Sequence, residues 1–176
     1  DAQESRGLGD VYKRQIVING FSKSHAMTGW RLGYACGPRI ILDQMLKIHQ
    51  YAIMCAPTTS QYAAVDALRA GDEDVQRMRE EYNGRRRYLM HRFEEMGLEC
   101  FEPYGAFYCF PCIKEFGMTS EEFATNLLKT EKVAVVPGNS FGSSGEGYVR
   151  CSYAASMNNI KEATYRIGEF IKRNKR

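Results

Sequence analysis

The 176-residue sequence lacks any apolar run close to the roughly 18–20 residues that cross a bilayer, and it shows no secretory hydrophobic segment. It has no internal repeat, and its net charge of +3 is too small to argue for or against nucleic acid. The hydrophobic content of 44% is enough to build a core. We therefore expect an ordinary globular chain of the cytoplasm, with neither a membrane nor a nucleic acid as partner.

The cysteines do not follow a disulfide or metal-binding pattern. Cys109 and Cys112 form a single CxxC, and no second pair completes a zinc site. The segment around them alternates like a strand, which would place these two side chains on opposite faces. The six cysteines are Cys36, Cys55, Cys100, Cys109, Cys112 and Cys151. We expect reduced, mostly buried thiols and no metal.

The first 15 residues differ in character from the rest. "DAQESRGLGDVYKRQ" has no apolar period and no cap pattern, and its end, "DVYKRQ", is what a sequencing-library adapter would encode if it were read as protein. We interpret residues 1–15 as adapter-derived sequence or a disordered leader and leave them out of the fold prediction. The native-looking chain then begins at Ile16, already inside a strand.

Two short apolar runs predict neighbouring strands at residues 16–19 and 32–37. "IVIN" is continuous and β-branched, which is typical of a strand buried on both faces of an α/β sheet. "LGYACG" ends just before Pro38. Apolar spacing then predicts helices over residues 40–51, 58–71 and 73–96. Thr58 or Thr59 is the expected cap of the second helix.

The remaining chain alternates between strands and helices. We expect strands in "GAFYCFPCI", "VAVVPG" and "YVRCSYA", a helix capped by Thr119 or Ser120, and a closing amphipathic helix over residues 157–173. The arginines of the 73–96 helix are interspersed with glutamates, which favours a solvated face over a nucleic-acid surface. The pattern predicts two units, residues 16–71 and residues 72–176.

One short stretch, "GFSKSHAMTGWRLGY", carries the chemistry. Lys23 lies just past the carboxyl end of the first strand, where ligands bind in open α/β sheets. Burial and nearby cations would favour its neutral amine, which can attack a carbonyl. Arg31 offers a planar fork that suits a phosphate dianion. Gly29 and Gly33 would let the backbone approach that ligand, and the hydroxyls of Ser22 and Thr28 could reach the remaining phosphate oxygens.

An amine for an aldehyde beside an anchor for a phosphate describes pyridoxal 5′-phosphate. "GFSKSHAMTGWRLG" resembles the lysine signature of class I and II aminotransferases, and "AMTGWRLGYACGP" is especially similar to bacterial aspartate- and aromatic-type members. The likeness continues through "GAFYCFP", "VVPGNSFG" and "YVRCSYA". It implies an α/β chain of fold type I: the end of the cofactor-binding large-domain sheet over residues 16–71, and the complete small α+β carboxy-terminal domain over residues 72–176.

The resemblance also implies a role for each site residue. Lys23 would bind the cofactor aldehyde covalently and move the proton at the substrate Cα. Arg31, with Ser22, would bind the cofactor phosphate, and Arg150 would grip the substrate α-carboxylate. Taken singly, Lys23 could be a solvated surface lysine and Arg31 a salt-bridge partner. Arg150, within an apolar strand, could instead pair with a buried acid.

The family's other cofactor contacts precede the lysine, so the resemblance implies that over half of a full-length enzyme is absent. The expected parent is a cytoplasmic homodimer of amino-acid metabolism that moves an amino group from an L-amino acid to a 2-oxo acid. The 176-residue chain alone would be inactive. A β-lyase of the same fold would share the same residues, and a non-catalytic carboxy-terminal module is a third possibility.

Overall fold

The computed structural model describes residues 14–175, which form two compact units divided between Arg77 and Met78. The interpretation of residues 1–15 as a leader therefore falls almost entirely outside the described residues. Across residues 14–175, no helix combines the length and apolar character needed to cross a membrane.

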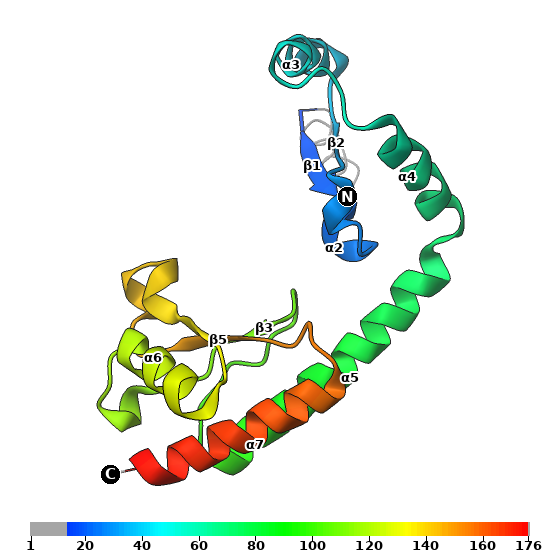
Figure 1. Cartoon of the computed structure of the whole chain (residues 1–176). Coiled ribbons are helices and arrows are strands. Elements are labelled where there is room, and N and C mark those ends of the chain that lie inside the picture. The colour runs from blue at the N-terminus through cyan, green and yellow to red at the C-terminus, as the bar shows by residue number, and fades with distance from the viewer. Residues whose placement is uncertain (1–13, 176) are drawn as a thin grey trace, which may run out of the picture. The chain divides into compact units, whose positions relative to one another are not determined.

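The first unit begins with an antiparallel strand pair, β1 (Val17–Gly20) and β2 (Gly33–Cys36). The connection between them holds a single helical turn, α2 (Phe21–Ser24), and the 3-10 helix η1 (Thr28–Trp30). Figure 1 shows β1 and β2 side by side, with α2 at one end of the pair. Both strands lie close to where the two apolar runs predicted them.

The expectation that β1 is buried on both faces is wrong for the described chain. Ile18 is 76% exposed, and Val17 is 42% exposed. The reason is that β2 is the one strand that pairs with β1 among residues 14–175, and only a small core of Phe21, Met27 and Ala64 lies nearby. The apolar side chains of "IVIN" therefore form surface that residues 14–175 leave largely uncovered.

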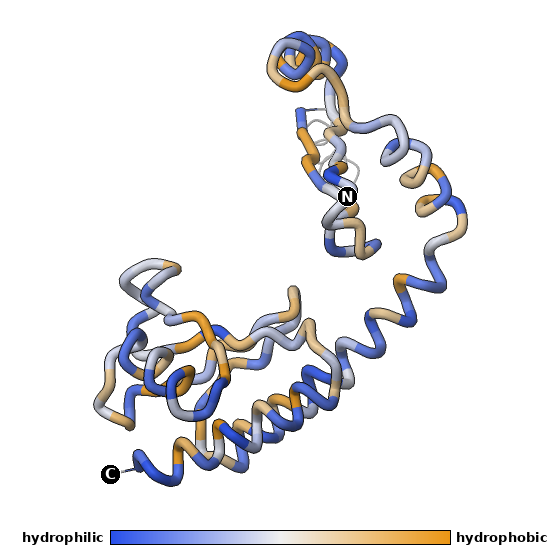
Figure 2. The backbone as a smooth tube through the Cα atoms, viewed as in Figure 1, coloured by the Kyte–Doolittle hydropathy of each residue, from blue (hydrophilic) through white to orange (hydrophobic). Residues whose placement is uncertain are grey.

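Two helices follow in the first unit, α3 (Arg39–Ala52) and α4 (Thr58–Ala70). The expected Thr58 or Thr59 cap is wrong, because the helix already begins at Thr58 and Pro57 takes the N-cap position without a side-chain bond. No residue of α3 is buried. Figure 2 shows hydrophobic and hydrophilic residues interspersed along α3, and Ile40, Leu46 and Ile48 are exposed within residues 14–175.

The long charged helix α5 (Asp72–Met96) ends where Gly97 takes a positive φ of 75°. Glycine tolerates this left-handed conformation without a steric penalty, which suits a helix stop. The helix's arginines pair with acids one turn away, Arg85 with Glu81 and Arg92 with Glu95. The predicted solvated face holds for Arg77, Arg79 and Arg87, which are exposed, whereas Arg85 and Arg92 are half-buried.

The second unit contains a three-stranded antiparallel sheet in the order β3–β5–β4. Its strands are β3 (Tyr108–Cys109), β5 (Val149–Ser152) and β4 (Val136–Pro137). They are shorter than the three apolar segments suggested, and isolated bridges such as Cys100 to Pro111 extend the pairing. Three 3-10 helices lie in the loops: η2 (Lys114–Phe116), η3 (Gly138–Phe141) and η4 (Ser143–Gly145).

Helices α6 (Ser120–Glu131) and α7 (Met157–Asn174) complete the second unit. The predicted cap of α6 is Thr119: its hydroxyl accepts from the Glu122 backbone N–H, and the Glu122 carboxylate accepts from the Thr119 backbone N–H. This exchange lowers the pKa of Glu122. Ser156 caps α7 in the same way through the Asn159 N–H. Both helix starts are therefore fixed by local sequence.

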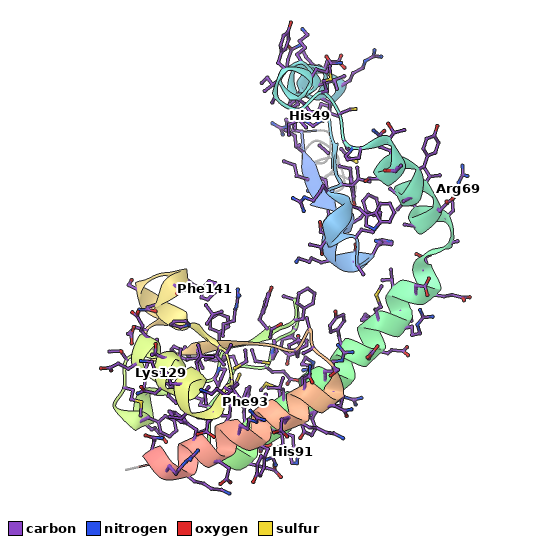
Figure 3. The ribbon with its side chains drawn as sticks, viewed as in Figure 1. His49, Arg69, His91, Phe93, Lys129 and Phe141 are labelled. Carbon is purple, nitrogen blue, oxygen red and sulfur yellow. The ribbon has the colours of Figure 1, made fainter. Side chains whose placement is uncertain are left out.

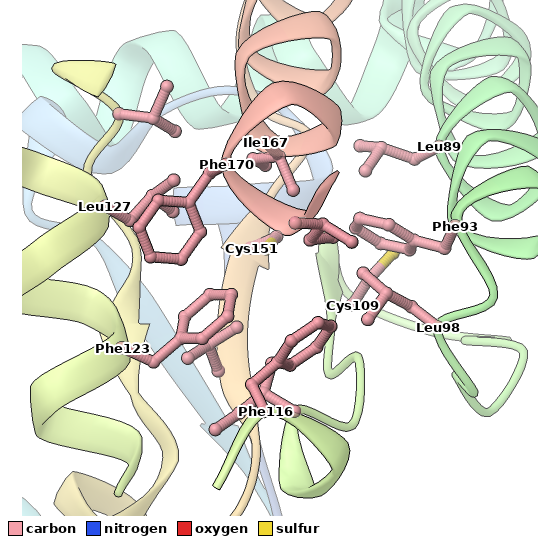
Figure 4. Close-up of a cluster of buried hydrophobic side chains, with 14 of the residues drawn as sticks. Leu89, Phe93, Leu98, Cys109, Phe116, Phe123, Leu127, Cys151, Ile167 and Phe170 are labelled. Carbon is pink, nitrogen blue, oxygen red and sulfur yellow. The ribbon is translucent and has the colours of Figure 1, made fainter. Parts of the chain in front are cut away.

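A single apolar core lies between the sheet and these helices (Figure 4). Phe123 of α6 meets Phe170 of α7 edge to face, with ring centroids 5.1 Å apart. Phe93 of α5 and Leu127 of α6 are fully enclosed at 1% and 0% exposure. The second unit thus has a complete core of its own, in contrast to the first.

The six cysteines are all free thiols. Cys109 and Cys151 are buried, as expected, and burial raises the pKa of Cys151 to about 12. Cys36 and Cys55 are exposed, contrary to the expectation of mostly buried thiols, because the elements that carry them are uncovered here. No group of residues within the described chain has a metal-binding arrangement.

Truncation of Phe93 should test the core of the second unit. We expect Phe93→Ala to lower the free energy of unfolding by about 3–5 kcal/mol, because the lost ring leaves a cavity in a close-packed core. Tyr165→Ala, on an exposed position of α7, should change it by less than about 0.5 kcal/mol. Urea denaturation followed by circular dichroism measures both. Equal effects from the two variants would contradict this account of the core.

Candidate active site

The connection between β1 and β2 brings Lys23 and Arg31 to one end of the strand pair. Gly20 lies opposite Gly33, and the Phe21 N–H donates to the Leu32 carbonyl at 3.4 Å. Lys23 follows Gly20 by three residues, and Arg31 precedes Gly33 by two. Since the chain leaves and returns at the same end, both basic residues must lie near that end.

Two of the glycines, Gly20 and Gly33, allow the close approach of β1 and β2. A Cβ at Gly33 would lie 3.0 Å from the Asn19 carbonyl oxygen, and one at Gly20 would lie 3.2 Å from the Leu32 carbonyl oxygen. Both are tighter than ordinary van der Waals contacts, so larger residues would force the strands apart. Gly29 has no atom within 4 Å of its hypothetical Cβ. The space beside Gly29 is therefore open, and the predicted approach of a ligand to its backbone stays a prediction.

Lys23 lies in the last turn of α2, and its side chain is exposed. The sequence led us to expect an amine taken out of water, which would release its neutral form. In the structure, the side chain of Lys23 is instead accessible to water. The position just past the carboxyl end of β1 agrees with the prediction.

Arg31 holds a strained backbone conformation at the end of the same connection. Its φ is 53°, in the left-handed region, and Ala26 also has a φ of 53°. Non-glycine residues adopt this region at a cost of about 1–3 kcal/mol, and such residues gather at ligand sites. The Arg31 guanidinium donates to the Thr28 carbonyl at 3.0 Å through one nitrogen. The other donors of its fork remain available for an anion.

The two hydroxyls proposed for the phosphate are not equivalent. The Thr28 hydroxyl donates to the Ser22 carbonyl at 2.7 Å. Its proton is therefore given to the backbone here, and Thr28 would donate to a phosphate oxygen only by giving up that bond. Ser22, half-buried in α2, remains the candidate hydroxyl donor of the pair.

The charge of this region fits a phosphate-bearing aldehyde. Residues 14–42 include four Lys or Arg residues (Arg14, Lys23, Arg31 and Arg39) and neither Asp nor Glu. An amine, a guanidinium fork and a hydroxyl are the donor set that a phosphate dianion with a nearby carbonyl requires. The residues present therefore fit pyridoxal 5′-phosphate.

Ser60 supports this connection, and no sequence pattern indicated that it would. Its hydroxyl donates to the Trp30 carbonyl at 2.7 Å, and the residue is only 3% exposed. The bond ties the first turn of α4 to the backbone residue directly before Arg31. A serine within a helical pattern carries no signal for such a contact, since it depends on a partner 30 residues away.

Arg150 belongs to β5 of the second unit. Its neighbours Val149 and Cys151 are buried in the core, so Arg150 lies on the opposite face of the strand. The alternative of a buried ion pair is not what the structure shows: within residues 14–175 no acid lies within salt-bridge distance of its guanidinium. Its guanidinium carbon instead lies 4.3 Å from the ring centroid of Tyr108 and 4.5 Å from that of Phe141.

Comparison with known proteins identifies the family. The model of the family described as "Aminotransferase class I and II" matches residues 1–167. The chain belongs to the class I and II aminotransferases. Members of this family use pyridoxal 5′-phosphate and have fold type I, so the family resemblance, the α/β fold class and the cofactor predicted from the sequence are confirmed.

Individual relatives are similar over almost the whole of this chain. It is 55% identical to YugH of Bacillus subtilis (strain 168) over 164 residues, 93% of this chain and 42% of YugH. It is 47% identical to an aspartate aminotransferase of Pyrococcus abyssi, covering 96% of this chain and 44% of that enzyme. The solved aromatic aminotransferase of Pyrococcus horikoshii OT3 superimposes with a TM-score of 0.87 at 46% identity, covering 92% of this chain and 44% of that one. The aminotransferase chain thus spans less than half the length of these relatives.

Removal of the Ser60 hydroxyl should loosen the β1–β2 connection. We expect Ser60→Ala to speed backbone hydrogen exchange at residues 28–32 by about fivefold to tenfold, because one buried hydrogen bond contributes about 1 kcal/mol. Thr59→Ala, at the neighbouring exposed position of α4, is the matched control and should leave that exchange unchanged. Identical exchange in both variants would show that the Ser60–Trp30 bond does not restrain the connection.

Proposed function

We propose that this chain is the carboxy-terminal part of an aminotransferase that moves an amino group from an L-amino acid to a 2-oxo acid. The observation that carries the proposal is that Lys23 and Arg31 lie on the same connection between β1 and β2, in which Arg31 has a positive φ. The surrounding segment, residues 14–42, contains no acid, and the chain belongs to this family. In this assignment residues 16–71 end the large cofactor-binding domain, and residues 72–176 are the small domain.

Each residue has a distinct task in the proposed reaction. When bound, pyridoxal 5′-phosphate supplies a carbonyl that condenses with amines and a ring that withdraws electrons from the substrate Cα. Lys23 contributes the amine that attaches the cofactor and, once released, a base that takes and returns the Cα proton. Arg31, assisted by Ser22, holds the phosphate so that the lysine and the carbonyl stay within reach.

Arg150 orients the substrate in this scheme. A guanidinium binds a carboxylate through two parallel N–H···O bonds, which fixes direction as well as position. An amino acid and the matching 2-oxo acid both carry an α-carboxylate, so one residue can serve both half-reactions. We infer the same role for Arg150 here, and the absence of an acidic partner among residues 14–175 supports it.

The relatives favour amino transfer over β-elimination. The similar proteins named above include aspartate and aromatic aminotransferases. A β-lyase would use the same three basic residues, but it would release pyruvate and ammonia instead of a new amino acid. We further propose a cytoplasmic homodimer of amino-acid biosynthesis as the parent; the exposed apolar side chains of β1 and α3 provide surface for such an assembly.

Cofactor attachment tests the role of Lys23 and also the alternative of a non-catalytic module. We expect borohydride reduction of the chain with pyridoxal 5′-phosphate, followed by peptide mass spectrometry, to place the cofactor on Lys23 in preference to Lys47, an exposed lysine of α3. Lys23→Ala should abolish the preferred adduct. Equal labelling of the two lysines would refute the assignment and favour a module without cofactor chemistry.

The phosphate contact can be separated from the amine. We expect Arg31→Ala to reduce labelling of Lys23 by pyridoxal 5′-phosphate about tenfold, because a charge-assisted bond to a phosphate is lost. Labelling by pyridoxal, which has no phosphate, should not change. Arg39→Ala is the matched control, since Arg39 is exposed and pairs with Asp43. A similar loss with both aldehydes would mean that Arg31 does not bind the phosphate.

The chain alone should not transaminate at a useful rate. It spans 44% of the Pyrococcus abyssi enzyme, and Lys23 is exposed to water, so the groups that would tune the cofactor ring are not positioned by residues 14–175. An assay with aspartate or phenylalanine, 2-oxoglutarate and cofactor should give a rate at least about a thousandfold below that of the full-length relative. A rate within tenfold of that relative would contradict the expectation.

A further inference from the structure

The side chain of Arg150 is held by aromatic rings from two other elements of the second unit. Tyr108 comes from β3 and is paired with Ser152 of β5, two residues from Arg150 on the same face of the sheet. Phe141, labelled in Figure 3, comes from η3. The Arg150 guanidinium carbon lies over both rings, at 4.3 Å and 4.5 Å from their centroids.

The ring of Phe141 is itself supported. Phe110 meets it edge to face, with ring centroids 5.6 Å apart and an interplanar angle of 76°. Phe110 follows Tyr108 by two residues, so alternation along the chain places both on the same side. The three aromatic side chains and Arg150 therefore form one cluster, which we call the aromatic clamp: Tyr108, Phe110, Phe141 and Arg150.

The clamp leaves the in-plane donors of Arg150 uncommitted. Cation–π contacts engage the flat faces of a guanidinium, while its five N–H groups point outward in the plane. Across residues 14–175 the structure gives those groups no hydrogen bond and no acid. Arg85 provides the contrast within the same unit: it lies over one ring, Tyr82, at 5.2 Å, and one nitrogen of its guanidinium donates to the Glu81 carboxylate.

Aromatic rings can hold Arg150 in place without blocking its N–H groups, whereas an acidic partner would block them. An acidic partner would position Arg150, but its carboxylate would compete with an incoming carboxylate for the same donors. Aromatic rings restrict the side chain without occupying those donors. The loss of side-chain freedom that normally opposes binding has then already occurred before a ligand arrives.

We propose that Tyr108 and Phe141 are positioning residues that hold the Arg150 guanidinium ready for the α-carboxylate of an amino acid or 2-oxo acid. The proposal rests on the role assigned to Arg150 under the proposed function. Neither ring contacts the reacting atoms; both act through Arg150. A lysine in place of Arg150 could not be held in this way, since an ammonium group has no plane to stack and no bidentate fork.

Nuclear magnetic resonance of the full chain, labelled at arginine and without cofactor, tests the clamp directly. We expect the Arg150 side-chain signals to show upfield ring-current shifts, and their N–H resonances to move on titration with 2-oxoglutarate. Arg85 should respond less to 2-oxoglutarate, because its side chain is only 15% exposed and one of its guanidinium nitrogens already donates to Glu81. An Arg150 spectrum without ring-current shifts, or with no greater response than Arg85, would overturn the proposal in the unmodified chain.

Paired substitutions then separate positioning from folding. Tyr108→Leu and Phe141→Leu should each remove part of the ring-current shift and weaken 2-oxoglutarate binding about fivefold, the fold-change that corresponds to about 1 kcal/mol of side-chain ordering. Tyr108→Phe and Phe141→Tyr keep a ring and should restore both readouts. Backbone amide spectra report whether each variant is folded. Unchanged binding in folded leucine variants would refute the positioning role.

The outcome is independent of the cofactor experiment. If the folded leucine variants bind 2-oxoglutarate as well as the unmodified chain while Lys23 still takes up pyridoxal 5′-phosphate, the proposed function stands and only the role of the two rings is refuted. A clamp that binds 2-oxoglutarate while Lys23 shows no preferred labelling would mean that the carboxylate site exists without the proposed cofactor chemistry.

Discussion

The antiparallel pairing of β1 and β2 is the constraint on which the candidate cofactor site depends. Two facing glycines let the strand backbones approach closely at the end where the connecting segment leaves and returns. Any residue with a side chain at those positions would widen that end and separate the lysine from the arginine. The strand pair sets the position of the connection, and two further features fix the backbone near Arg31: its own positive φ and the hydrogen bond from the Ser60 hydroxyl to the Trp30 carbonyl.

In the second unit, one face of strand β5 packs into the core and the opposite face carries the residue proposed to bind the substrate. Val149 and Cys151 of β5 point into a core that is complete within the unit, while Arg150 between them points to the opposite face. The core can therefore fix the strand rigidly without touching the guanidinium. Rigid support of this kind is what a residue that must meet a ligand in one orientation requires.

The sequence predicted those features that depend on local patterns. Helix periodicity located α3, α5 and α7 within a few residues, Thr119 was one of the two caps expected for α6, and the lysine signature indicated both the cofactor and its family. The errors concern contacts between distant residues. The burial of β1 depends on further strands that would pair with it. The N-cap of α4 is Pro57 and not Thr58 or Thr59, because the helix already begins at Thr58. The rings around Arg150 come from positions 108 and 141, and no pattern along the chain links them to position 150.

The alternation along β5 also limits how this family can change length. The turn-rich segment before the strand, residues 138–147, carries Phe141, so a change of length there would move one ring of the aromatic clamp while the pairing of β5 with Tyr108–Cys109 and Val136–Pro137 could persist. An insertion or deletion inside the strand would instead exchange its two faces, placing a guanidinium in the apolar interior and two buried side chains in water. Insertions and deletions in related chains should therefore be rarest inside the strand.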